Sequence, residues 1–173
     1  MGQVTIKRVT NANLYLDGNS LLGKAEEVSL PEVKFKMSEH NGLGMIGDVE
    51  LPSGIEKMEA KVKWNSFYED VLLKVSNPFK PLSFQVRASR ETYGSAGRSA
   101  EEPIVAYITG QPKSFPAGNF KKHDNVEAES TFTVTYYKLV VNSVEIVEID
   151  VMSNIFKING VDQLATYRAN IGG

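Results

Sequence analysis

The chain has 173 residues, no cysteine, and 19 basic against 21 acidic side chains, for a formal net charge of −2. This length suits one domain that buries about 70% of the surface of its unfolded chain, so folding needs neither a disulfide nor a metal. The missing cysteines exclude thiol catalysis and cysteine-ligated metal sites, and the balanced charge argues against a dedicated nucleic-acid binder, which normally carries a clustered basic excess.

Strands dominate the first third of the chain, because apolar and polar residues alternate there. Residues 13–16 precede the turn signal Asp17-Gly18, and alternation resumes over residues 26–37. The clearest strand is residues 57–64, in which charged side chains occupy one face and apolar groups, ending at Trp64, occupy the other. One face should therefore meet water, while the face that carries Trp64 joins a core.

Two helices are predicted to interrupt the strands. The first begins at Ser66, which has the spacing of a capping box with Glu69, and it ends before an Asn-Pro dipeptide. The second is short, over residues 161–168, with Asn159 as its possible cap and Gly172 beyond its end.

Further strands are predicted at residues 82–87, 104–108 and 131–141. The last of these meets residues 144–149 across only Asn142-Ser143, which predicts a tight hairpin. The predicted fold class is therefore mainly β, with one helix in mid-chain and a short helix near the C-terminus.

Two glycine-rich segments, residues 38–56 and 91–102, are expected to form long flexible loops. No repeat, low-complexity tract or linker divides the sequence, so residues 1–173 are expected to form a single domain. No stretch approaches the roughly 20 apolar residues of a membrane helix, so we expect a soluble protein without direct membrane anchoring.

Residues with catalytic potential lack partners in the sequence. His40 and His123 have no second ligand or base at a useful spacing and are expected to be solvated. The glycine-rich segments do not lead into a helix, as a phosphate loop requires. Glu101-Glu102 and Glu127 with Glu129 are expected to be solvated or pore-facing pairs and not catalytic carboxylates. We predict no catalytic, cofactor-binding or metal site, and no enzyme activity.

Several segments, in the same order along nearly the whole chain, resemble the major tail tube protein of contractile-tailed phages and of phage-tail-like bacteriocins. These segments are residues 13–20, 30–34, 42–45, 58–61, 135–139, 148–150 and 158–172. The most specific are TYYKL at residues 135–139, EID at 148–150 and INGVDQL at 158–164.

The resemblance implies a β-barrel or sandwich subunit that forms hexameric rings, which stack into the inner tube of a contractile tail. It also implies a virion protein, assembled in the cytoplasm of a bacterial host beside a tail sheath, a tape-measure protein, a baseplate and a tail terminator. DNA would pass through the lumen without specific binding. Strands with one charged face suit such a wall, because the lumen holds water, and identical copies joined head to tail can close into rings.

Two sets of residues are predicted to serve this assembly. The polar halves of two alternating strands are expected to face the lumen: Lys57, Glu59, Lys61, Lys63, Glu127, Glu129, Thr131, Thr133 and Thr135. The glycine-rich segment Gly42, Leu43, Gly44 and Met45 is expected to contact the neighbouring ring.

Three other interpretations stay open. The tube of an R-type bacteriocin would use the same kind of subunit but conduct ions, and a type VI secretion tube would carry effectors. The signature at residues 159–162 favours the phage type over the secretion type. A β-sandwich module that binds a glycan or a receptor would expose an aromatic cluster, whereas most aromatic residues here occupy apolar strand positions.

Overall fold

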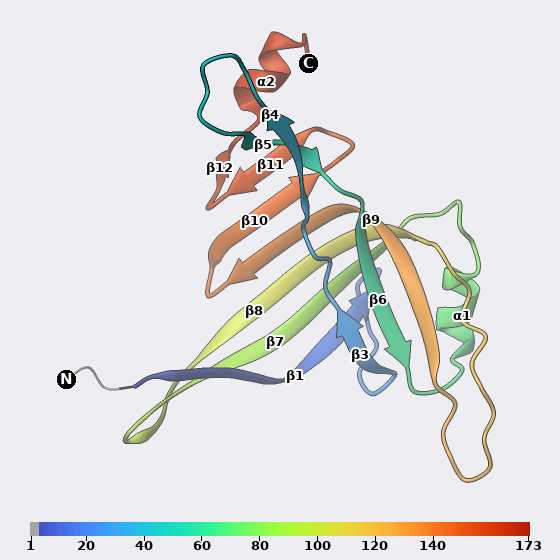
Figure 1. The fold of residues 1–173 in the computed structure, drawn as a ribbon. Helices are drawn as coiled ribbons and strands as arrows, with labels where there is room; N and C mark the ends of the chain where they lie inside the picture. The colour runs from blue at the N-terminus through green and yellow to red at the C-terminus, as the bar shows by residue number, and fades with distance from the viewer. Residues whose placement is uncertain (1–3) are drawn as a thin grey trace.

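Strands make up most of the protein, and the computed structural model describes residues 4–173 (Figure 1). The strands are β1 (Ile6–Leu16), β2 (Asn19–Ser20), β3 (Ala25–Ser29), β4 (Phe35–His40), β5 (Val49–Ile55), β6 (Met58–Trp64), β7 (Leu82–Gly94), β8 (Gly97–Pro112), β9 (Ala128–Val141), β10 (Val144–Asp150), β11 (Ile155–Ile158) and β12 (Val161–Asp162). The helices are α1 (Glu69–Val75) and α2 (Ala165–Asn170). The predicted mainly β fold, with one helix in mid-chain and one near the C-terminus, is confirmed.

β9 joins two arms of one antiparallel sheet. Along one side it pairs with β8, and along the other its first half pairs with β6 and its second half with β10. The first arm is the row β12-β11-β10-β9-β8-β7-β1-β2, which includes the second half of β9. The second arm is β3 with β6, which pairs with the first half of β9. The register slips between the halves, because Thr109 lies opposite Tyr136 but Gly110 lies opposite Val134. Thr135 is therefore the extra residue of a β-bulge, which bends the strand.

The two arms enclose one hydrophobic core. Every second residue of β6, from Met58 to Trp64, is at most 3% exposed and belongs to the same cluster as residues of β1, β7, β8 and β10. Phe132 of β9 is fully buried, and its ring meets that of Phe84 edge-on at 4.7 Å between centroids. Trp64 donates its indole N–H to the Ser130 hydroxyl at 2.9 Å. Trp64 is thus a core residue, as the sequence predicts.

The barrel implied by the family resemblance is not closed. Among the described strands, β2 pairs only with β1 and β3 pairs only with β6, so the two arms end at separate edges (Figure 1). The sheet instead curls over its core at the β9 bulge. Gly110 permits this close approach, because a Cβ at that position would lie 2.6 Å from the Thr133 carbonyl oxygen. The curvature therefore comes from a bulge and a glycine, and not from hydrogen bonding around a full circle.

The two glycine-rich segments expected to be loops are largely strands. Residues 38–56 fall mainly in the β4–β5 hairpin, whose pairing runs from Phe35–Ile55 to His40–Val49. Residues 91–102 are the end of the β7–β8 hairpin, which is paired up to Gly94–Gly97. Glycine does not prevent pairing here, because Gly44 and Gly97 lie at the turns, where they adopt φ values of +87° and +100°. Both hairpins project from the body of the sheet (Figure 1).

α1 begins at Glu69, and the predicted capping box with Ser66 does not form. Tyr68 is the N-cap residue, in an extended conformation, and no described side chain caps the helix. The Tyr68 hydroxyl donates to Asn65 Oδ1 at 2.6 Å, and the Asn65 amide donates to the Gly23 carbonyl at 2.6 Å. These bonds hold the segment before α1 against the turn that precedes β3, which delays the start of the helix.

α2 begins at Ala165, because Val161–Asp162 forms β12 in place of the predicted first helical turn. Asn159 and Gly160 adopt φ values of +50° and +76° and make the two-residue turn between β11 and β12. Asn-Gly favours this kind of hairpin turn, so Asn159 is a turn residue and not a helix cap. Gly172 follows the helix, as predicted. Neither helix in the described range, residues 4–173, is long and apolar enough to cross a membrane.

Candidate assembly and lumen surfaces

The predicted lumen residues of β6 and β9 lie side by side. Cross-strand pairing sets Glu59 opposite Thr133, Lys61 opposite Thr131, and Lys63 opposite Glu129. Directly opposed residues of an antiparallel pair share a face of the sheet. These side chains therefore form one polar surface, whose reverse side is the core.

The remaining three predicted residues lie at the margins of this surface. Lys57 precedes β6, and Glu127 precedes β9 and forms an isolated bridge with Asn119. Thr135 is the bulge residue, and its hydroxyl donates to the Thr109 carbonyl at 3.4 Å. That the surface faces a lumen stays a prediction.

Ion pairs offset part of the charge on this surface. Lys57 Nζ lies 3.3 Å from Glu59 Oε1, and Lys113 Nζ contacts the same oxygen. Lys61 Nζ lies 3.3 Å from Glu129 Oε1. Hydrogen bonds from Lys113 and Lys57 hold the pKa of Glu59 below its ordinary value, so this carboxylate is ionised at neutral pH. Strand alternation misses Lys113, because that residue follows β8 and lies outside the predicted strands.

A second polar surface covers the outer side of the other arm, where a row of side chains crosses five strands. The row is Tyr107, Lys138, Glu148, Lys157 and Asp162, each opposite the next. Glu148 accepts a hydrogen bond from Lys157 Nζ at 2.8 Å and another from the Tyr136 hydroxyl at 2.9 Å. The bond from Lys157 is the main reason why the pKa of Glu148 is lowered, and burial is the main reason why the pKa of Tyr136 is raised.

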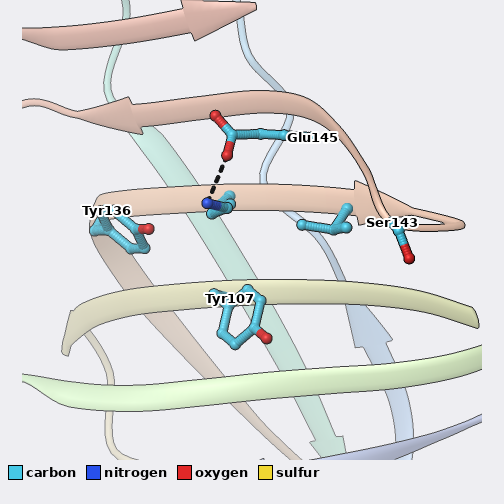
Figure 2. Close-up of a pocket in the computed structure, with 6 residues that line it drawn as sticks. Tyr107, Tyr136, Ser143 and Glu145 are labelled. Carbon is cyan, nitrogen blue, oxygen red and sulfur yellow. Dashed lines mark ion pairs between the residues drawn. The ribbon is translucent and has the colours of Figure 1, made fainter. Parts of the chain in front are cut away.

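A hollow of about 490 Å³ lies beside this row, between β8, β9 and β10 (Figure 2). Its lining consists of Tyr107, Tyr136, Lys138, Val140, Ser143 and Glu145. Lys138 Nζ pairs with Glu145 Oε2 at 2.6 Å, and Ser143 points away from Glu145 in Figure 2. Residues 4–173 contain no group of three or more His, Asp or Glu residues that could hold a metal. The hollow is a surface depression with aromatic and charged side chains in its lining.

Other residues considered for chemistry are exposed or already paired. His40 ends β4, and His123 lies in the loop between β8 and β9; both are exposed. Glu101 and Glu102 each pair with an arginine of the β7–β8 hairpin. These glutamates are engaged in ion pairs along the hairpin.

The β4–β5 hairpin exposes apolar side chains at its tip and on both of its faces. They are Phe35, Met37, Leu43, Met45, Ile46, Val49 and Leu51. The predicted inter-ring residues, Gly42 to Met45, form the tip, where the Met45 N–H donates to the Gly42 carbonyl at 3.1 Å. Sequence reasoning misses Ile46 and the strand residues, because the glycines around them suggest a loop. Leu43, Met45 and Ile46 gather at the tip, and exposed apolar groups of this kind mark surfaces that contact other proteins.

Sequence comparison relates the chain to tail tube proteins, which confirms the resemblance. A sequence family described as phage tail tube protein FII matches residues 6–172. The chain is 28% identical over 166 residues to the tail tube protein of Escherichia phage P2, covering 92% of this chain and 94% of that protein. It is also 28% identical over 156 residues to the major tail tube protein of Serratia phage KSP20, covering 89% of this chain and 88% of that protein.

Two solved structures share the fold. The sheath/tube terminator of the extracellular contractile injection system PVC, in its extended state, has a TM-score of 0.57 over 75% of this chain and 91% of its own, at 11% identity. A chain from the sheath-tube complex of the same system has a TM-score of 0.56 over 77% of this chain and 88% of its own, at 12% identity. At these identities the likeness establishes a common fold.

Proposed function

Because the chain belongs to the phage tail tube protein FII family, it is a structural subunit of a tail tube, and we propose that its copies stack as hexameric rings around a channel for genome delivery. The observation that carries this proposal is the family match over residues 6–172, nearly the whole chain. The exposed apolar hairpin supports it, because a stacking subunit needs contact surfaces for its own copies. The polar outer surface of β6 and β9 supports a wall that meets water.

The proposed partners are those of a contractile tail. The tube would lie inside a sheath, begin at a baseplate, end at a terminator and enclose a tape-measure protein before DNA passes. The chain would form one domain, work without catalysis, and be assembled in the cytoplasm of its bacterial host before it becomes part of the virion tail. Relatives of the fold come from a sheath-tube complex and a sheath/tube terminator, which is consistent with these neighbours.

The polar surface of β6 and β9 would line the lumen and let DNA slide. Three of its lysines lie in ion pairs with Glu59 or Glu129, which reduces the positive charge that is free to bind phosphate. Affinity for DNA depends on the number of phosphates that a protein neutralises. A surface whose charges pair with each other therefore holds DNA weakly.

Replacing both Glu127 and Glu129 with Lys tests this assignment. The variant frees Lys61 from its partner and adds cations to the surface, so DNA release from tailed particles should become several-fold slower at low salt and recover at high salt. The tubes should still assemble. A control that changes two other exposed glutamates, Glu32→Lys with Glu69→Lys, should leave the rate of release unchanged. Unchanged release in the first variant would count against this surface as the lumen.

The proposed function itself is tested by negative-stain electron microscopy of the purified protein over a concentration series. Stacked rings or hollow tubes of constant diameter are expected. A protein that stays monomeric at all concentrations, and also when baseplates of its tail are added as templates, would contradict the proposal.

A further inference from the structure

Two exposed segments project from opposite ends of the β6–β9 pair. The β4–β5 hairpin leads into the start of β6, opposite Val134, and the loop of residues 113–127 leads into the start of β9, where Ala128 lies opposite Trp64. Figure 1 shows the hairpin at one end of β6 and the loop beyond the other end, near α1. The seven residues of β6 span about 20 Å, at about 3.3 Å per residue, and hold the two segments apart.

Both segments are apolar at their tips. The hairpin exposes Leu43, Met45 and Ile46 at 108%, 44% and 109%, and the loop exposes Phe115 and Phe120 at 58% and 81%. The Phe120 ring packs on Phe67 at 5.7 Å between centroids, so the loop presents this ring from a fixed position. A subunit that stacks end to end needs complementary surfaces at its two ends, and these clusters occupy such positions.

The charges around the two tips are opposite. Residues 38–51 contain Glu39, Asp48 and Glu50 and no lysine or arginine. Residues 114–124 contain Lys121 and Lys122 against a single aspartate. All five side chains are exposed. The negative charge of the hairpin and the positive charge of the loop favour contact between these two segments. Like charges disfavour contact of either segment with a copy of itself.

We propose that the tip of the β4–β5 hairpin, residues 41–50, docks on residues 114–124 of the next copy of this chain along the tube. The inference rests on the proposed stacking of rings and names the surface that receives the hairpin. Contact of the apolar tip with Phe120 supplies affinity. Attraction between the acidic residues of the hairpin and Lys121 and Lys122 makes the hairpin bind this loop and not a second hairpin. Because the two halves lie at opposite ends of one subunit, the contact is head to tail and repeats without closing.

Paired cysteines test the contact directly, because the chain has none of its own. In a chain that carries both Leu43→Cys and Phe120→Cys, oxidation of assembled tubes should give a ladder of covalent multimers on a denaturing gel. A disulfide needs Cα atoms within about 7 Å. β6 keeps these positions farther apart within one copy, so each crosslink joins two copies. Each single-cysteine variant, as the control, should give dimers at most.

The outcomes separate this inference from the proposed function. Intact tubes by electron microscopy that yield no ladder would overturn the docking and leave the tube subunit standing. Absence of tubes in the cysteine-free chain, under the templated conditions above, would instead contradict the proposed function.

Charge reversal gives an independent test that needs no crosslink. Asp48→Lys with Glu50→Lys, and separately Lys121→Glu with Lys122→Glu, should each lower the assembled fraction about tenfold at low salt, because like charges then meet. The chain that carries all four changes should assemble nearly as well as the original. Unchanged urea midpoints would show that each variant folds. Normal assembly of either half-reversed chain, or no recovery in the fully reversed chain, would overturn the proposal.

Discussion

Ser130 is fully buried in the core, and its hydroxyl accepts the indole N–H of Trp64 at 2.9 Å. Ser130→Ala leaves that N–H without its partner in apolar surroundings, so the free energy of unfolding should fall by about 1–3 kcal/mol. Urea unfolding can be followed by the fluorescence of Trp64, the single tryptophan. The control Ser83→Ala, at an exposed position, should stay within about 0.5 kcal/mol. Equal stability of Ser130→Ala and the original chain would contradict the importance of this bond.

The same residues show what single positions reveal in the sequence. Trp64 closes an alternating strand, so its burial is predictable, and Ser130 shares the parity of buried Phe132. Ser66 and Glu69 have the spacing of a cap, yet Asn65 bonds to the Gly23 carbonyl and keeps the chain extended there. Residue spacing predicts strand faces well, because the face of each side chain depends only on its position along that strand. It misses the start of the helix, because that start depends on a hydrogen bond to a backbone group far away in the sequence.

At the scale of elements, the row of side chains that crosses β8 to β12 should make the C-terminal strands sensitive to acid. Glu148 is 14% exposed, and the hydrogen bond from Lys157 lowers its pKa. A carboxylate whose pKa is lower in the folded state stabilises the fold above its unfolded pKa, about 4.3, and this contribution is lost as pH falls through the folded value. Glu148→Gln should therefore lower the free energy of unfolding by about 1–2 kcal/mol at pH 7.

The difference between Glu148→Gln and the original chain should shrink as the pH falls from about 4.5 towards 3. Urea unfolding at a series of pH values measures it. Glu32→Gln, at a side chain that is 77% exposed, should match the original chain throughout. A difference that stays constant with pH would show that Glu148 acts through shape and not through charge.

The positions of the main strands could be predicted from the sequence, but whether the sheet closes into a barrel could not. Alternation locates β6, β7 and β9, and strand parity correctly places Glu59, Lys61 and Lys63 on one polar face. The open sheet depends on the bulge at Thr135 and on which edges meet, and a pattern within one strand carries no information about either. The glycine-rich hairpins were expected as loops for a related reason, because their strands pair with each other and bury little, so hydrophobic alternation is weak there.

At the scale of the whole molecule, the outer part of the β4–β5 hairpin, residues 37–53, can be removed without disturbing the core. Its strands pair only with each other among the described strands, and the Glu56 N–H donates to the Lys34 carbonyl at its base at 2.8 Å. A chain in which a two-glycine turn joins Lys36 to Gly54 keeps Phe35, whose ring packs on Phe156, and Ile55, which packs against the core. It should therefore keep nearly the original urea midpoint. Electron microscopy should show no tubes. Tubes of normal diameter would mean that the hairpin plays no part in stacking.

The position of β9 between the two arms also governs when the protein can fold during synthesis. β6 is complete at Trp64, but one of its edges pairs with residues 128–134, and β8 needs the same strand. Neither arm can close over the core until the ribosome has released β9, and distant pairing of this kind makes folding slow. Until then the nascent chain exposes the apolar faces of β6, β7 and β8 together. Transiently exposed apolar faces of this kind make unfinished chains prone to aggregate, so the late synthesis of β9 prolongs the stage at which the chain is most vulnerable.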